Sequence, residues 1–242
     1  MAKPTDYDRI AKAWHQATGH TGGPLKKYRL NDLLIDAVGP IDGQRLLELG
    51  AGNGYFLRLL LRRRSGQRPD RLVISDVSTA MLELAQRHFR VGDAEYERVD
   101  LRKSLPFEYS AFDALVASMV LNELRNTHLD RALAECFRVL SPGGRLAATI
   151  THPDFIDRLR RNGQLERGSA AGFTMPGKGR LRLPVVPRPL ERYLSAFIEA
   201  GFTVETEAVE VTDEMVRERP GLRHAASTPL ALLFRADKPS AP

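Results

Sequence analysis

A glycine-rich turn near residue 50 is the feature whose residue types and spacing most directly suggest chemistry. The apolar run Arg45–Glu48 leads through Leu49 into Gly50-Ala51-Gly52-Asn53-Gly54, and helical residues follow from Tyr55. Glycines at alternate positions allow positive φ angles and let a ligand approach the backbone closely. A dinucleotide site would have its third glycine where Tyr55 stands, so the turn favours a nucleotide-like ligand other than NAD(P).

Three acidic residues end successive predicted strands beside this turn. Glu48 precedes the glycines, while Asp76 and Asp100 end the second and third apolar runs. A carboxylate in the position of Asp76 can accept both hydrogen bonds from a ribose diol, although it could instead cap the helix that begins near Ser78. Three carboxylates at neighbouring strand ends favour a nucleoside with a cationic tail over a phosphate-rich ligand.

His152, Asn122 and Glu123 are the candidates for acid–base chemistry. His152 follows the fifth apolar run, and the other two follow the fourth. A histidine titrates near pH 6.5, so His152 could take a proton from a hydroxyl or an amine. Histidines at strand ends also hydrogen-bond to loop backbone, and Glu123 could equally cap the helix that follows it. Both alternatives stay open for each residue.

The elements that position these residues are short apolar segments, which alternate along the chain with segments of helical periodicity. This alternation is typical of a parallel sheet covered by helices on both faces. The first five predicted strands are Arg45–Glu48, Leu72–Ser75, Tyr96–Val99, Ala114–Met119 and Leu146–Thr151. The last two, Thr203–Val211 and Pro229–Arg235, are joined by a short polar connection and are expected to pair antiparallel. We therefore predict an α/β fold with a seven-stranded sheet, mostly parallel with an antiparallel edge strand.

The remaining segments suggest one domain in four parts. We expect a helical N-terminal lid over residues 1–40, a cofactor-binding core over 41–151, an insertion that covers the acceptor over 152–188, and a completion of the same sheet over 189–238. The helix with apolar residues from Leu129 to Leu140 should end in the turn Ser141-Pro142-Gly143-Gly144. Both covering segments would lie over the carboxyl ends of the strands, where open α/β sheets bind ligands.

The net charge of +6 at pH 7 could indicate an acidic partner, but Arg and Lys are scattered along the chain. The densest run, Arg62-Arg63-Arg64, falls at a predicted helix end, where cations oppose the helix dipole favourably. We therefore do not expect a nucleic-acid partner. No apolar run approaches the roughly 20 residues that span a bilayer, the N-terminus lacks an apolar signal, and Cys136 is single. These features predict a cytoplasmic protein with no membrane partner; they leave the oligomeric state open.

Five segments in order resemble the class I S-adenosylmethionine-dependent methyltransferases over about residues 45–150. Glu48–Gly54 is similar to the first family motif, and Asp76–Leu82 to the ribose segment. Asp100-Leu101 together with Leu105–Phe107 resembles the adenine segment of the family. Phe112–Ala114 and Arg138–Gly144 resemble its two remaining motifs. The resemblance implies a Rossmann-like fold with S-adenosylmethionine as cofactor. Pro187–Leu190 and Ala200–Phe202 are similar to the branch that acts on small molecules.

The resemblance also implies roles for individual residues. Glu48 would orient the ammonium group of the cofactor, Asp76 would hold the ribose, and the backbone around Ser118 and Met119 would lie near the sulfonium. The other implied cofactor contacts are Gly50, Ala51 and Gly52 at the methionine part, Val77 and Met81 in the ribose segment, Asp100 and Leu101 at the adenine, and Tyr7 as a lid residue.

The activity that follows is transfer of the methyl group to an O, N or C nucleophile of a small molecule by in-line displacement. The sulfonium already provides a good leaving group, so no metal is needed and alignment of the nucleophile is the main task. An RNA methyltransferase and a non-catalytic protein that binds S-adenosylmethionine are the alternatives.

Overall fold

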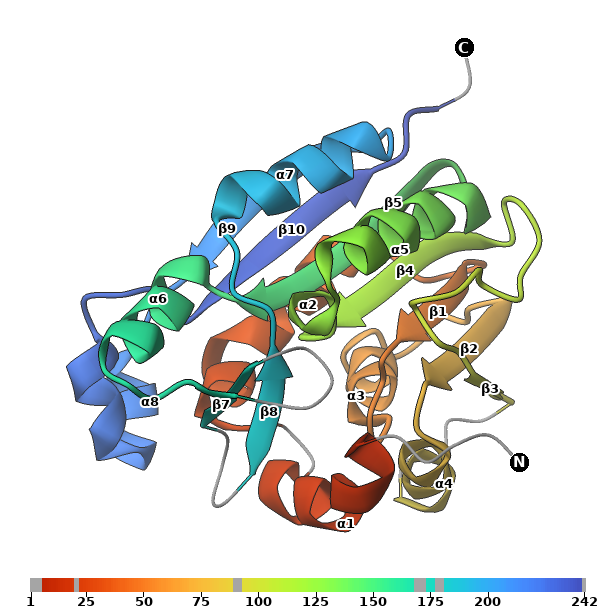
Figure 1. Cartoon of the computed structure of the whole chain (residues 1–242). Coiled ribbons are helices and arrows are strands. Elements are labelled where there is room, and N and C mark those ends of the chain that lie inside the picture. Colours follow the sequence, from red (N-terminus) through yellow and green to blue (C-terminus); the bar gives the residue numbers. More distant parts are fainter. Residues whose placement is uncertain (1–5, 20–21, 89–92, 168–172, 177–180, 241–242) are drawn as a thin grey trace.

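The computed structural model describes residues 6–19, 22–88, 93–167, 173–176 and 181–240, and its centre is one seven-stranded sheet (Figure 1). Across the sheet the strands follow the order β3-β2-β1-β4-β5-β10-β9. They are β1 (Arg45–Leu49), β2 (Arg71–Asp76), β3 (Glu95–Arg98), β4 (Phe112–Ser118), β5 (Leu140–Thr151), β9 (Thr203–Val209) and β10 (Ala231–Asp237). Strands β1 to β5 pair in parallel, and β10 runs antiparallel to both β5 and β9. The predicted α/β sheet is confirmed, with its antiparallel strand next to the edge strand β9.

Side chains that alternate along the strands build a core on each face of the sheet. Leu47 and Leu115 lie in the core beneath α5 (Asn126–Val139) and α7 (Leu190–Glu199). Leu46 and Val116 lie in the opposite core, beneath α2 (Asn31–Val38), α3 (Tyr55–Arg63) and α4 (Thr79–His88). Because the central strands are buried on both faces, their sequences are almost continuously apolar. This burial is the reason that they were visible as short apolar runs.

The N-terminal segment is helical, as predicted. It contains α1 (Asp6–Thr18), the short π-helix η1 (Lys26–Leu30) and then α2. In Figure 1, α1 lies beyond the end of the sheet to which the arrowheads of β1, β2 and β4 point, and it contacts α4. His15 of α1 stacks on His88 of α4 with ring centroids 4.4 Å apart. Helix α1 therefore lies at the carboxyl end of the parallel strands.

The segment from 152 to 188 has more regular structure than its sequence indicated. It forms α6 (Pro153–Arg161) and an antiparallel sheet of β6 (Glu166–Arg167), β7 (Phe173–Pro176) and β8 (Arg182–Val185). Helix α6 begins with Pro153 in its first turn and buries Ile156 and Leu159. We predicted no element here because three short strands with so few apolar residues give no periodicity. The proposed boundaries of the four parts of the chain remain a prediction.

Two predicted connections differ in the structure. Strand β5 begins at Leu140, directly after α5, where Leu140 pairs with Phe112. The pairing then shifts to Ala114 with Arg145, so the turn predicted at Ser141–Gly144 is an irregularity inside the strand. Between β9 and β10 the polar connection holds α8 (Asp213–Glu218) and the 3₁₀ helix η3 (Pro220–Ala225), which the sequence did not indicate.

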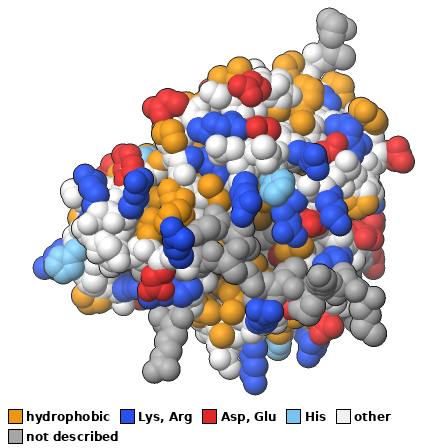
Figure 2. All heavy atoms as spheres, viewed as in Figure 1, with side chains coloured by type: hydrophobic (Ala, Val, Ile, Leu, Met, Phe, Trp, Pro, Cys, Tyr) orange, Lys and Arg blue, Asp and Glu red, His pale blue; other side chains and the backbone are white. Residues whose placement is uncertain are grey.

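Charge on the surface is mixed. Figure 2 shows Lys and Arg side chains spread over the visible face, with acidic and apolar side chains between them. Several arginines are paired, including Arg71 with Glu95 and Arg138 with Glu135. Within the described part of the chain, no helix is long and apolar enough to span a membrane. Cys136 lies on the buried face of α5 as a core residue.

Candidate active site

The carboxyl ends of β1, β2, β4 and β5 bring the segments singled out from the sequence to one edge of the sheet. Parallel strands end at the same edge, and ligands of open α/β sheets bind there. The segments that follow these strands are the glycine turn, Asp76–Ser78, Met119 with the 3₁₀ helix η2 (Leu121–Glu123), and His152.

The backbone conformation favours glycine at the first two glycines of the turn, and at Gly50 a close neighbour also leaves no room for a side chain. Gly50 has φ 63°, and a Cβ there would lie 2.7 Å from the side chain of Val120. Gly52 has φ 58°, and a Cβ would lie 3.5 Å from the indole nitrogen of Trp14 in α1. Between them, the buried Ala51 donates its N–H to the carbonyl of Ser75. The turn is thus fixed to β2 while its glycines face the lid helix and the β4 loop.

The third glycine, Gly54, packs helices together. It has φ 75°, and a Cβ there would come within 2.8 Å of the Cβ of Ala85 in α4. Gly54 thus allows this close contact, and Tyr55 turns into the core, where its hydroxyl donates to Asn31.

Asp76 lies buried at the end of β2 with two of its acceptor positions in use. One carboxylate oxygen accepts the N–H of Gly52 at 2.8 Å, and the other accepts the N–H of Ser78 at 2.9 Å. Helix α4 is capped by the hydroxyl of Ser78, which accepts the N–H of Met81, so Asp76 is not the cap that we considered. Burial raises the pKa of Asp76 to about 6 even though these N–H groups oppose the shift.

Glu48 is the most deeply buried acid of the site, with 2% of its surface exposed. Burial raises the pKa of Glu48 to about 8, and the charge of Lys26 and the N–H of Leu57 offset only part of this rise. Its Oε2 atom accepts no hydrogen bond from any described residue. An orphaned carboxylate oxygen in a buried position is costly, so this atom is suited to a ligand that brings a donor.

Glu123 in η2 is held by helix α1. The hydroxyl of Tyr7 in α1 donates to its Oε1 at 2.5 Å. Burial raises the pKa of Glu123 to about 8; the bond from Tyr7 opposes the rise, and the charge of Asp76 adds to it. We considered Glu123 as a cap for α5, but that helix begins after Arg125 without a side-chain cap. The sequence gave no sign of this contact, since 116 positions separate Tyr7 and Glu123.

We call Glu48, Asp76 and Glu123 the acid cluster. The surroundings of each carboxyl group disfavour its ionised form. Burial raises the pKa of each carboxyl, and the charge of Asp76 raises the pKa of both glutamic acids further. Buried carboxylates that repel one another are stabilised in their ionised form by a nearby cation. The acid cluster therefore favours a positively charged ligand.

The other predicted residues at the β2 and β3 ends differ in how they are held. Both carboxylate oxygens of Asp100 accept hydrogen bonds from the side chain of Arg102, at 2.8 and 2.9 Å. Burial opposes ionisation of Asp100, but these bonds hold its pKa below the ordinary value. Leu101 and Met81 are buried, and Val77 is half-buried. Asp100 is therefore satisfied by its own loop, unlike Glu48, whose Oε2 atom has no described donor.

Strand β4 ends in a strained turn at the positions expected near the sulfonium. The hydroxyl of Ser118 accepts from Thr149 at 3.3 Å, and the N–H of Met119 donates to the carbonyl of Thr149 at 2.8 Å. Met119 has φ 61°, a left-handed conformation that side-chain-bearing residues rarely adopt. The turn directs Val120 against Gly50, and in this way it fixes the β4 loop over the glycine turn.

His152 and Asn122 are both buried, but in different hydrogen-bonding states. Nδ1 of His152 accepts the N–H of Asp154 and thereby caps α6, which is the backbone role that we weighed against acid–base chemistry. Burial lowers the pKa of His152 despite the opposing charge of Asp154, and the bond at Nδ1 leaves the proton on Nε2. The Oδ1 atom of Asn122 has no described donor, and its carbonyl accepts the N–H of Val186.

Several residues that the sequence did not reveal complete the site. A carboxylate oxygen of Asp8 accepts from the hydroxyl of Ser78 at 2.6 Å and from the N–H of Ala80 at 3.1 Å, which ties α1 to the start of α4. Asn53 lies 3.1 Å from Nδ1 of His15. Lys26 contributes a cation beside Glu48. Only Asn53, which lies within the glycine motif, carried a local signal.

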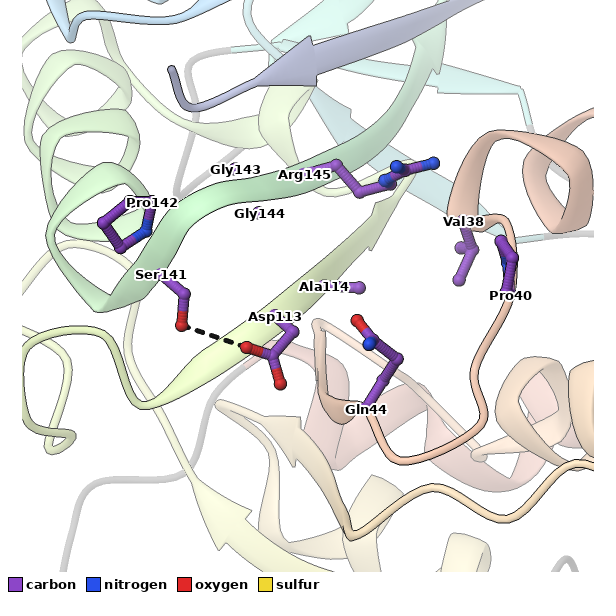
Figure 3. A pocket seen from close by; sticks show the side chains of 10 residues that line it. All are labelled: Val38, Pro40, Gln44, Asp113, Ala114, Ser141, Pro142, Gly143, Gly144 and Arg145. Carbon is purple, nitrogen blue, oxygen red and sulfur yellow. Dashed lines mark hydrogen bonds between the residues drawn. The ribbon is translucent and has the colours of Figure 1, made fainter. Parts of the chain in front are cut away.

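A separate pocket lies at the opposite, amino end of the strands (Figure 3). It is lined by residues that begin β4 and β5, among them Asp113, Ser141 and Arg145. The carboxylate of Asp113 is satisfied by the guanidinium of Arg45 at 2.8 Å and by the hydroxyl of Ser141 at 3.0 Å. The acid cluster lies at the other edge of the sheet, so this pocket takes no part in the chemistry considered below.

Known proteins share both the sequence and the fold of this chain. Residues 46–144 match the family model for a methyltransferase domain. The ubiquinone/menaquinone biosynthesis C-methyltransferase UbiE of Vibrio vulnificus is 35% identical over 178 residues, which are 66% of this chain and 64% of that protein. Its counterpart from Vibrio campbellii is 29% identical over a stretch of the same length and coverage. The chain thus spans less than two thirds of the length of the curated relatives that it matches first.

The solved structures agree with this at the level of fold. An S-adenosylmethionine-dependent methyltransferase from Mesorhizobium loti superimposes with a TM-score of 0.65 at 24% identity, over 85% of this chain and 96% of that one. The glycine turn and the acidic strand ends therefore fall within the matched residues. Residues 46–144 are thus similar to a methyltransferase domain, and the fold of the chain is that of an S-adenosylmethionine-dependent methyltransferase.

Proposed function

We propose that this chain binds S-adenosylmethionine at the acid cluster and transfers its methyl group to a small-molecule acceptor. The observation that carries the proposal is the set of three carboxylates at the carboxyl edge beside the glycine turn, the buried Glu48 and Asp76 and the half-buried Glu123. The cofactor supplies a methyl group on a cationic sulfonium, together with an ammonium group. A ligand with two cationic centres matches the electrostatic demand of these carboxylates better than a phosphate-rich nucleotide does.

The residues present fit the parts of such a ligand. A carboxylate offers about four lone-pair positions. Asp76 uses two of them for Gly52 and Ser78, which leaves acceptors for a ribose diol. The unpartnered Oε2 of Glu48 is available to a donor such as an ammonium group. Because Asp76 also fixes the N–H of Gly52, ribose binding and the shape of the glycine turn are coupled through one side chain.

For the acceptor we propose a metabolite with a nucleophilic carbon. The support is the name of the relatives, which are C-methyltransferases, and the lid and insertion that surround the carboxyl edge. Methylation at carbon leaves the acceptor with a proton to lose. Glu123 is suited to receive it, since its pKa of about 8 lies near working pH. His152 is less suited because its Nδ1 is already engaged by Asp154, and we propose that its Nε2–H group serves as a donor at the pocket wall.

The bond between Tyr7 and Glu123 gives this role a test. Replacement of Tyr7 with Phe removes a hydrogen bond that lowers the pKa of Glu123, so that pKa should rise. If Glu123 acts in its ionised form, the rising limb of the kcat/KM profile should move to higher pH, and kcat/KM at pH 7 should fall by about tenfold. The measurement is a pH–rate profile with the identified acceptor.

The matched control is Tyr28→Phe. It removes another bond between a tyrosine and a glutamate, from Tyr28 to Glu218 at 2.8 Å, which joins η1 to α8. This control should leave the profile in place. An unmoved profile in a folded Tyr7→Phe protein would exclude Glu123 as the group that takes the proton.

Two measurements test the function itself. Calorimetric titration of S-adenosylhomocysteine into the full chain should give a micromolar dissociation constant, and the absence of binding by folded protein would refute the proposal. Transfer of a labelled methyl group from S-adenosylmethionine into a cell extract should then label a small molecule. Binding without any labelled product would indicate a non-catalytic protein, and label in RNA would indicate the macromolecular alternative.

A further inference from the structure

Arg188 is a buried arginine in the segment that joins β8 to α7, and 8% of its surface is exposed. Its Nη2 atom donates a hydrogen bond to the carbonyl of Leu124, which directly follows η2. Two residues earlier on the same segment, Val186 donates its N–H to the carbonyl of Asn122 at 2.8 Å. These two bonds hold the segment that carries Arg188 against the loop that carries Glu123.

Most of the hydrogen-bonding capacity of Arg188 is unused. A guanidinium has five N–H donors in one plane. The Nε and Nη1 atoms of Arg188 are buried and have no partner among the described residues. The guanidinium carbon lies 4.9 Å from the centre of the Tyr193 ring, and burial lowers the pKa of Arg188. A buried cation without an acceptor for its donors is costly, so this side chain is suited to a ligand that brings an anion.

A second arginine nearby shows the ordinary behaviour of this residue type. Arg192 in α7 donates a hydrogen bond to the carboxylate of Asp130 in α5, and this bond raises the pKa of Arg192. The charge of Asp130 also acts on Arg188, but that carboxylate is already engaged. Over the residues that the structure describes, no carboxylate forms an ion pair with Arg188. Two arginines four positions apart thus have opposite environments.

The facing loop offers a polar group with the opposite requirement. Asn122 is buried, with 3% of its surface exposed, and its Oδ1 atom has no described donor. Arg188 therefore lacks acceptors and Asn122 lacks a donor, on two segments that are bonded to each other. Between Asn122 and Leu124 stands Glu123, the residue that we assigned to receive the proton of the methyl acceptor. Groups left without partners on both segments favour a polar ligand over a purely apolar one at this place.

We propose that Arg188 is a subsite for a carboxylate group of the methyl acceptor, so that the substrate is a small carboxylic acid. The inference rests on the proposed function. A planar carboxylate can accept two N–H groups of a guanidinium in parallel. A single arginine beside Glu123 balances one negative charge, which favours a carboxylate over a phosphate group with a charge of about −1.5 to −2. The carboxylate would anchor the acceptor at the loop that carries the proton-accepting group.

The first test identifies the acceptor. The full chain is incubated with methyl-labelled S-adenosylmethionine and a cell extract, and mass spectrometry gives the functional groups of the labelled small molecule. This product should contain a carboxylate. A labelled product without a carboxylate would overturn the inference and leave the proposed function intact. The absence of any labelled small molecule would refute the proposed function and this inference with it.

The second test compares the identified acid with its primary amide, which keeps the shape but not the charge. The unmodified protein should have a KM about ten- to a hundredfold higher for the amide, because hydrogen bonds between charged groups contribute this much to binding. Arg188→Met should raise the KM of the acid by a similar factor and change the KM of the amide by less than about threefold, so that the preference disappears. A merely structural role of Arg188 would affect both substrates alike.

The matched control is Arg192→Met, which makes the same substitution in the paired arginine and should keep the preference for the acid. If Arg188→Met does not fold, Arg188→Gln replaces it, since its amide can still donate to the carbonyl of Leu124. Each variant should bind S-adenosylhomocysteine within about threefold of the unmodified protein, because Arg188 is assigned to the methyl acceptor and not to the cofactor. A preference that persists in a folded Arg188 variant, or equal KM values in the unmodified protein, would overturn the subsite.

Discussion

Asp76→Asn is expected to weaken the binding of S-adenosylhomocysteine by about ten- to a hundredfold, because hydrogen bonds to an ionised group contribute about 1.5–3 kcal/mol each. The amide keeps the size of the carboxylate but has one acceptor atom in place of two. Gly52 and Ser78 already draw on both oxygens of Asp76, so the amide could not serve these N–H groups and a ribose diol together. Calorimetric titration at pH 8 would measure the loss.

The matched control for this variant is Asp70→Asn. Asp70 is exposed and directly precedes β2, whereas Asp76 ends it, so the same chemical change is made at opposite ends of one strand. The control should bind the ligand as the unmodified protein does. Thermal unfolding of Asp76→Asn would establish that the variant is folded, and an unchanged affinity in folded protein would remove Asp76 from the ribose site.

The sheet and the donor side of the site could be predicted because their signals are local. A run such as Arg45–Leu49 is apolar since it is buried on both faces, and its end is marked by glycines that the backbone requires. Asp76 is found in the same way, because a strand of known direction puts its last residue at the carboxyl edge. Strand β3 differs from its prediction by one residue only.

The lid contacts could not be predicted because they depend on where distant segments meet. The bond from Tyr7 to Glu123 joins residues 116 positions apart. The position of Lys26 beside Glu48 depends on a π-helical turn and on Gly22, neither of which gives a periodic pattern. His152 shows a further limit, since its type allows either acid–base chemistry or capping, and the sequence alone did not show that its Nδ1 accepts the N–H of Asp154.

The acid cluster also makes cofactor affinity depend on pH. Burial raises the pKa of Glu48 to about 8, so this carboxyl is mostly protonated at pH 6 in the unliganded protein. If the ammonium group of the ligand requires the ionised form, affinity falls by up to about tenfold for each unit of pH below 8. The ammonium and carboxylate groups of S-adenosylhomocysteine keep their charges over this range.

The dissociation constant should therefore rise by about fiftyfold between pH 8 and pH 6, and binding at pH 7 should release about one proton. Titrations in two buffers with different ionisation enthalpies measure both quantities. Glu48→Gln should bind more weakly at pH 8 and should lose the pH dependence, because its amide does not titrate. A dependence that survives in this variant would assign the linked proton to another group, with Glu123 the next to be replaced, since burial raises the pKa of its carboxyl to about 8 as well.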